Sequence, residues 1–102
     1  MNQAQMMQQL RKMQQEMARV QEELANTVIE GTAAGGAVTA SVNGEYRVTK
    51  VTIKPEAVDP DDVETLEDLV TVAFNDALGK VKALSESKLG RLTGGMRIPG
   101  LM

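Results

Sequence analysis

The stretch that decides the fold is VTASVNGEYRVTKVTIKP, residues 38–55. Its first residues alternate apolar and hydroxyl side chains, which is the pattern of a half-buried strand. Asn43-Gly44 follows, and this dipeptide is typical of a type I′ hairpin turn because both residues tolerate positive φ angles. A second β-branched run ends at a proline, which interrupts the backbone hydrogen bonding of a sheet. The stretch therefore predicts an antiparallel hairpin with strands at 37–42 and 46–54.

The apolar residues change face within the second of these strands. Val51 and Ile53 share one face by their spacing, whereas Val48 is expected on the other. A β-bulge near Thr49–Lys50 would account for this change of face.

A third strand is predicted on the N-terminal side of the hairpin. Three β-branched residues at 27–29 favour a strand, which we place at 27–33. The Gly35-Gly36 pair that follows marks a hairpin turn. Three consecutive strands joined by short turns form an antiparallel meander.

Residues 2–25 are predicted to form one long helix with a continuous apolar seam. The apolar side chains recur in alternating steps of four and three, which is the 3.5-residue repeat of coiled coils. The seam consists of Met6, Leu10, Met13, Met17, Val20 and Leu24. Such a helix is about 36 Å long, whereas a compact domain of this size has a radius of gyration of about 13 Å. We therefore expect a homodimer with projecting helical arms, in which this helix pairs either with its own copy or with the partner's sheet.

A second long helix is predicted from about Pro60 to Leu89. Asp59 is a good N-cap, and Pro60 suits the first helical position. Gly90 is expected to follow the last helical residue.

The predicted element order is α-β-β-β-α, an α+β fold with a three-stranded antiparallel sheet and two long helices. The 102 residues, of which 42% are hydrophobic, suffice for one domain, which we place at 1–92, followed by a flexible tail at 93–102. Only Tyr46 and Phe74 are aromatic. The core must therefore be built mostly from aliphatic side chains, and a core shared between two copies would strengthen it.

The composition leaves little material for catalysis. The chain has no histidine and no cysteine, which removes the commonest general base, a reactive nucleophile and two common metal ligands. The acids at 56–68 lack the spacing of a calcium loop, and acids favour the start of a helix. We therefore expect no enzyme, no cofactor and no metal site. With no secretory signal and no apolar run of about 18 residues, we expect a cytoplasmic protein with no membrane partner.

The charge is distributed unevenly along the chain. The formal net charge is −3, which taken alone argues against nucleic acid as a partner. Bases nevertheless gather in the first helix and toward the end of the second. These candidate DNA contacts are Arg11, Lys12, Arg19, Lys80, Lys82, Lys88 and Arg91. They form either a solvated helix surface or a cationic clamp for phosphates, and the residue pattern leaves both open.

Three spaced motifs span the middle of the chain. They are Val38-x-Ala40-x-Val42-Asn43-Gly44, Val48-x-x-Val51-x-Ile53-x-Pro55 and Glu67-Asp68-Leu69-Val70-x-x-Ala73-Phe74-Asn75-Asp76-Ala77. Together with the Gln- and Met-rich first helix and the Gly94-Gly95-Met96 tail, the ordered set resembles the YbaB/EbfC family of bacterial nucleoid-associated proteins. The resemblance implies a tweezer-like homodimer of the cytoplasm and nucleoid that binds duplex DNA without catalysis. It assigns the DNA contacts to the seven bases of the two helices.

The resemblance also implies where the two copies meet. The apolar dimer core would map to Val51, Ile53, Leu66, Leu69, Val70, Ala73 and Phe74, and the helix seam adds Met13 and Met17. DNA contact through backbone phosphates predicts weak sequence specificity, and two aromatic residues cannot supply a base-stacking platform.

One alternative function remains open, that of an adaptor whose apolar seam docks on a replication or recombination protein. The adaptor hypothesis predicts that a seam change such as Met13→Asp is harmful while charge reversals are tolerated.

Overall fold

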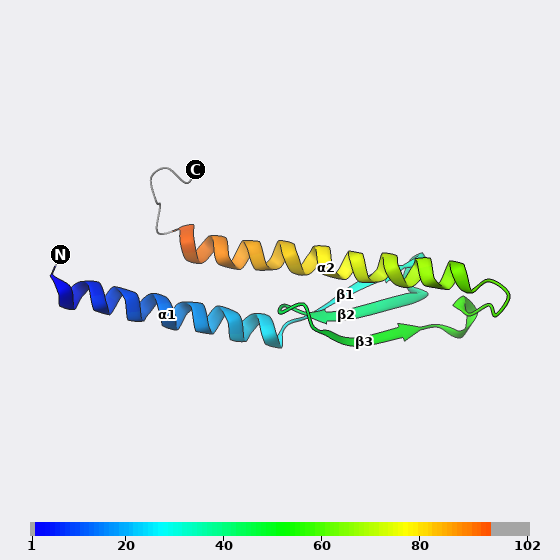
Figure 1. Ribbon diagram of the computed structural model, residues 1–102, viewed down its shortest axis with the longest axis horizontal. Helices are drawn as coiled ribbons and strands as arrows, with labels where there is room; N and C mark the ends of the chain where they lie inside the picture. Colours follow the sequence, from blue (N-terminus) through cyan, green and yellow to red (C-terminus); the bar gives the residue numbers. More distant parts are fainter. Residues whose placement is uncertain (1, 95–102) are drawn as a thin grey trace.

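The computed structural model describes residues 2–94 and has the predicted α-β-β-β-α order (Figure 1). Its helices and strands are α1 (Gln3–Asn26), β1 (Val28–Ala33), β2 (Val38–Asn43), β3 (Val48–Ile53) and α2 (Val63–Gly94). The short 3₁₀ turns η1 (Ala34–Gly36) and η2 (Pro55–Ala57) follow β1 and β3. The predicted α+β fold, with two long helices and a three-stranded antiparallel sheet, is confirmed.

The bulge predicted in β3 is present. Ser41 pairs with Lys50, but its neighbour Val42 pairs with Val48, so Thr49 is the extra residue on β3. The Thr49 hydroxyl donates a hydrogen bond to the carbonyl oxygen of Ser41 at 3.2 Å. The expectation that Val48 lies on the opposite face from Val51 is wrong, because the bulge returns Val48 to the same face.

The hairpin between β2 and β3 forms at Asn43-Gly44, but its turn is not of type I′. Among the described residues of this hairpin, the positive φ angle belongs to Tyr46, at 63°. The Asn43 side chain holds the loop by accepting hydrogen bonds from the amides of Glu45 and Arg47 at 2.9 and 3.0 Å.

Gly44 serves a close approach between the hairpin and α1. Its amide donates to the carbonyl oxygen of Leu24 at 2.7 Å. A Cβ atom at Gly44 would lie 2.5 Å from that oxygen and 2.7 Å from the Leu24 Cβ. Glycine is therefore required here by space rather than by a left-handed backbone.

The start of α2 differs from the prediction by three residues. The helix begins at Val63, and Asp62 caps it by accepting hydrogen bonds from the Thr65 amide at 3.3 Å and the Thr65 hydroxyl at 2.6 Å. Asp59, the predicted cap, instead accepts the Asp61 amide at 2.9 Å and so stabilises the preceding turn. The helix is therefore capped by Asp62, three residues after the predicted cap, and aspartate is equally favourable at either position.

The end of α2 was also predicted too early. The helix continues beyond Leu89 and through Gly90 to Gly94, so Gly90 is not a terminating residue. Of the predicted tail at 93–102, the first two residues belong to α2, and residues 95–102 lie outside the described part of the chain.

The core lies between α2 and one face of β1 and β2. Its buried side chains are small and aliphatic: Ala33, Val38, Ala40, Val42, Ala73, Ala77 and Val81. Gly31 lets α2 lie directly on β1, because a Cβ atom there would overlap the carbonyl oxygen of Ala73 and the backbone nitrogen of Ala77. Close packing of a helix on a sheet thus sets the position of α2.

The predicted dimer core is only partly buried within one chain. Ala73 is fully buried, and four residues pack against the core while staying half-buried: Leu66, Leu69, Val70 and Phe74. Val51 and Ile53 on β3 remain 41% and 38% exposed, because α2 packs on β1 and β2.

α1 and the C-terminal half of α2 form an arm that projects from the sheet. The two helices lie side by side and run in opposite directions (Figure 1), and the molecule measures 70 × 27 × 17 Å. Val20 and Leu24 of the seam are buried at the base of the arm, Met13 is half-buried, and three residues are exposed: Met6, Leu10 and Met17. The chain's own fold therefore covers one end of the seam.

Candidate nucleic-acid interface

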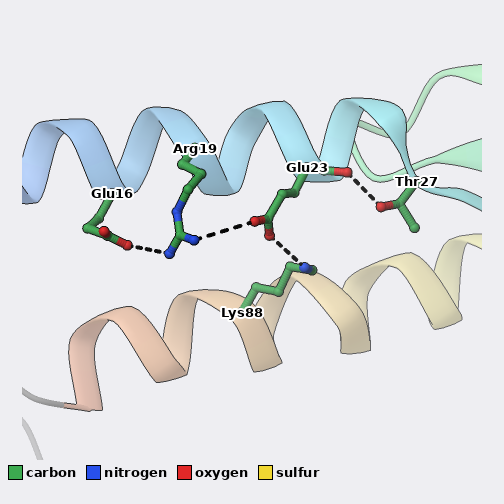
Figure 2. A network of polar contacts seen from close by, with 5 residues as sticks. All are labelled: Glu16, Arg19, Glu23, Thr27 and Lys88. Carbon is green, nitrogen blue, oxygen red and sulfur yellow. Dashed lines mark hydrogen bonds and ion pairs between the residues drawn. The ribbon is translucent and has the colours of Figure 1, made fainter.

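Two of the predicted DNA contacts, Arg19 and Lys88, meet at the base of the arm. Figure 2 shows that Arg19 lies between Glu16 and Glu23 of α1, while Lys88 of α2 reaches across to Glu23. The Arg19 guanidinium is 2.6 Å from the Glu16 carboxylate and 4.0 Å from that of Glu23, and the Lys88 Nζ is 2.9 Å from Glu23. The side chains lie together because positions 16, 19 and 23 follow one flank of a helix.

These contacts favour the charged forms of Arg19 and Glu23. The hydrogen bond and charge of Lys88 lower the pKa of Glu23, and Arg19 adds to this effect. The hydrogen bond and charge of Glu16, together with the charge of Glu23, raise the pKa of Arg19. Arg19 and Lys88 therefore each already face an anion of their own chain.

Lys80 lies over the sheet, where the C-terminal half of α2 begins. Its Nζ donates to the Glu30 carbonyl oxygen and lies 3.1 Å from the Asp76 carboxylate. Asp76 also accepts a hydrogen bond from the Thr32 amide at 3.0 Å. This hydrogen bond is the largest cause of the lowered pKa of Asp76, and the hydrogen bond from Lys80 is the second. Asp76 and Lys80 thus occupy two backbone groups of β1, the Thr32 amide and the Glu30 carbonyl oxygen, which discourages another strand from pairing there.

The other four predicted DNA contacts are exposed: Arg11, Lys12, Lys82 and Arg91. Within the described part of the chain none of them forms an ion pair. Arg11 and Lys12 lie on α1 beyond the point where α2 buries it, and Lys82 and Arg91 lie on α2. These are the cations of the arm that are open to an external anion.

Three further exposed bases were missed by the sequence reasoning. Arg47, Lys50 and Lys54 lie on or beside β3, and no ion pair involves them among residues 2–94. A charge count over the predicted strand would have found them, since residues 46–55 hold three bases and no acid.

The described residues contain no group of three or more side chains placed to hold a metal ion. None of the helices within residues 2–94 is both long and apolar enough to cross a membrane.

Known proteins are similar to this chain in sequence and in fold. A model of the YbaB/EbfC DNA-binding family matches residues 1–96. A nucleoid-associated protein of Chloroflexus aurantiacus is 55% identical over 97 residues, which cover 95% of this chain and 97% of that protein. One of Desulforamulus reducens is 53% identical over 100 residues, 98% of this chain and 95% of that protein. The crystal structure of an uncharacterized protein from Helicobacter pylori has the same fold, with a TM-score of 0.81 at 22% identity, covering 92% of this chain and 99% of that one.

Proposed function

We propose, since the chain belongs to the YbaB/EbfC DNA-binding family, that it acts as a homodimer whose arms bind the backbone of duplex DNA with weak sequence preference. Its place in the cell would be the nucleoid, within the cytoplasm. The observation that carries this proposal is the projecting two-helix arm with exposed cations that no acid of the described chain neutralises.

The uncovered face of β3 supports a homodimer. Val48, Val51 and Ile53 point to the side of the sheet that holds the core, yet they are 47%, 41% and 38% exposed. The half-buried Leu66 and Phe74 of α2 pack at the margin of the same core. A second copy that packs its own β3 and α2 here would bury these groups, and apolar burial is the main driving force of association.

The two edges of the sheet also differ in a way that favours this interface. Asp76 and Lys80 occupy the free edge of β1, so association through β1 would have to displace them. β3 has no such cover among the described side chains. The homodimer would therefore form on the β3 side and carry one arm from each copy.

The charges of the arm support DNA rather than a neutral ligand as the partner. Arg11 and Lys12 are exposed near the tip of α1, where glutamines make up much of the remaining polar surface. Contacts from Lys and Arg to phosphates position a protein on DNA without reading its sequence. Within the described residues the two aromatic side chains lie at the sheet and core, not on the arm, so base stacking is not expected there.

The experiment that tests the proposal is the double reversal Arg11→Glu with Lys12→Glu, assayed for binding to a short duplex over a range of salt concentrations. If a wild-type dimer engages about six phosphates, the slope of log K against log salt is about −5. The double variant should lose retention of duplex DNA and keep the circular dichroism and mass of the wild type. Unchanged DNA affinity in this variant would reject the arm as the binding site.

The reversal Arg47→Glu with Lys50→Glu provides the matched control. It changes the net charge by the same amount, but on the sheet instead of the arm. Because β3 is the proposed dimer face, light scattering must show that this variant keeps the mass of the wild type. Binding that depends only on net charge would fall equally in both double variants, whereas binding by the arm falls much further for the Arg11 and Lys12 pair.

A second candidate function is favoured by the exposed end of the α1 seam. Met6, Leu10 and Met17 are about half-exposed, and methionine-rich surfaces adapt to varied partners. An adaptor for a replication or recombination protein would use this surface. That function predicts a harmful effect of Met13→Asp and no effect of the charge reversal at Arg11 and Lys12.

A further inference from the structure

An open groove of about 450 Å³ lies between the two helices of the arm, near its base. It is lined by Arg19, Glu22, Glu23, Asn26, Thr27 and Lys88. Within this lining, the cations come from both helices, Arg19 from α1 and Lys88 from α2. The groove is therefore the place where the arm presents two positive charges toward one point.

That point is occupied by a carboxylate of the chain itself. One oxygen of Glu23 accepts a hydrogen bond from Lys88 at 2.9 Å, and its other oxygen lies 4.0 Å from Arg19 (Figure 2). The Thr27 hydroxyl is engaged elsewhere, since it donates to the Glu23 carbonyl oxygen at 2.6 Å. Two cations around a pair of oxygens is the arrangement in which Arg and Lys bind a phosphate.

The Glu23 carboxylate can leave this position at little cost. The side chains of Arg19, Glu23 and Lys88 are 63%, 44% and 26% exposed, so water can replace each contact. Exposed ion pairs of this kind are weak and are screened by salt. A polyanion that approaches the arm would present several phosphates at once and compete well for the two cations.

We propose that this groove is a binding site for a backbone phosphate of duplex DNA and that Glu23 occupies it in the free protein as a competitor. The proposal rests on the proposed function and assigns a site to it. Glu23 then weakens DNA binding in the wild type, and Glu16 does the same through its contact with Arg19.

The test compares Glu23→Gln with Glu22→Gln, each measured by fluorescence anisotropy on the same short duplex at the same salt concentration. Both variants remove one acid from adjacent positions of α1, so both gain equally from the altered net charge. Glu22 lines the same groove but forms no ion pair within residues 2–94. It therefore controls for the loss of a nearby negative charge without the loss of a contact to Arg19 or Lys88. Because a surface ion pair is modest in strength, Glu23→Gln should bind about two- to fivefold more tightly per arm than Glu22→Gln.

A purely structural role for Glu23 makes the opposite prediction. The Glu23–Lys88 pair joins the two helices of the arm, so its loss could lower the melting temperature and loosen the site. Glu16→Gln separates the two effects, because it frees Arg19 and leaves the contact between the helices in place. The proposal expects Glu16→Gln also to bind more tightly than Glu22→Gln, and Lys88→Gln to bind less tightly than wild type.

Three outcomes would overturn the inference. Equal affinities of the Glu23→Gln, Glu16→Gln and Glu22→Gln variants would show that the glutamates do not compete with DNA. Weaker binding by both Glu23→Gln and Glu16→Gln would show that they support the site. A wild-type protein that ignores duplex DNA at low salt would reject the proposed function and the inference together, whereas the first two outcomes leave the proposed function intact.

Discussion

Replacing Gly31 with Ala should separate α2 from the sheet. A Cβ atom at this position would overlap the carbonyl oxygen of Ala73 and the backbone nitrogen of Ala77, and it would lie 2.8 Å from the Ala77 Cα. All of these atoms belong to the backbone of α2, so no side-chain rotation relieves the overlap. The helix itself must move, which opens the core around Ala73 and Ala77, both fully buried.

The expected cost follows from two opposing effects. Overpacking of a core costs about 1–3 kcal/mol, with the high end expected where backbone must shift. Removing a glycine from a strand returns about 0.5–1 kcal/mol. The free energy of unfolding should therefore fall by about 2 kcal/mol, a large part of the roughly 5–15 kcal/mol that a domain has.

Gly79→Ala is the control, since it makes the same chemical change within α2. Gly79 is exposed, and a Cβ atom there meets nothing within 4 Å. This variant should gain about 0.5–1 kcal/mol from the higher helix propensity of alanine. The two variants should thus differ by about 3 kcal/mol, which corresponds to roughly 1–3 M in the midpoint of urea unfolding.

Urea unfolding followed by circular dichroism measures both variants under one set of conditions. If Gly31→Ala unfolds at the same urea concentration as wild type, the contact between β1 and α2 does not require glycine. A loss of stability in Gly79→Ala would show instead that α2 makes a close contact at Gly79. Within one chain a Cβ atom there meets nothing within 4 Å, so the contact would come from a second copy.

Two further substitutions test the two edges of the sheet. The Thr32 amide and Lys80 lower the pKa of Asp76 from its ordinary value of 3.8, so its charge stabilises the folded chain above pH 3.8, and this effect is lost as the pH falls through the lowered pKa. Asp76→Asn should therefore unfold at lower urea concentration than wild type at neutral pH, with a difference that shrinks below pH 3.8; a difference independent of pH would contradict this. Val51→Asp places a charge on the uncovered face of β3 and should weaken a dimer measured by light scattering about a hundredfold or more. If the variant remains a dimer down to the same protein concentration as the wild type, this face is not the interface.

The order of elements could be predicted because local patterns and tertiary packing agree for each of them. The alternation around β2, the β-branched start of β1 and the long apolar stripe of α1 each favour the element that forms. Even the bulge at Thr49 left a trace in the sequence, because Val48 and Val51 are an odd number of positions apart and only a bulge can place both on one face. Patterns with a fixed period carry this information directly.

The errors arose where one local signal had two physical explanations. Gly44 fits a type I′ turn, yet the structure needs glycine because α1 ends against it at Leu24. Asp59 and Asp62 are both good caps, and the rank of cap residues alone cannot choose between them. Such choices depend on contacts with distant parts of the chain, which a local pattern does not contain.

The sequence predicts which basic residues could form the candidate site. It does not predict which of them are left without an ion pair to an acid of the same chain. Arg19 and Lys88 are 69 positions apart, yet both contact Glu23. Lys80 is bound at the edge of β1 through Glu30 and Asp76. The bases alone predict one cationic surface, whereas the ion pairs divide it into cations that are open and cations that face an acid of the same chain.

The same division explains how a chain with net charge −3 could bind a polyanion. The acids at 56–68 precede and begin α2, at the end of the molecule opposite the tip of the arm (Figure 1). Val63 and Arg91 are separated by about 40 Å of helix, several times the Debye length of about 10 Å at 0.1 M salt. The distant acids are therefore screened from DNA on the arm, and the nearby glutamates Glu16 and Glu23 matter more. Removing distant acids should change DNA affinity less than removing either of these two, because proximity to the bound phosphates outweighs the total charge.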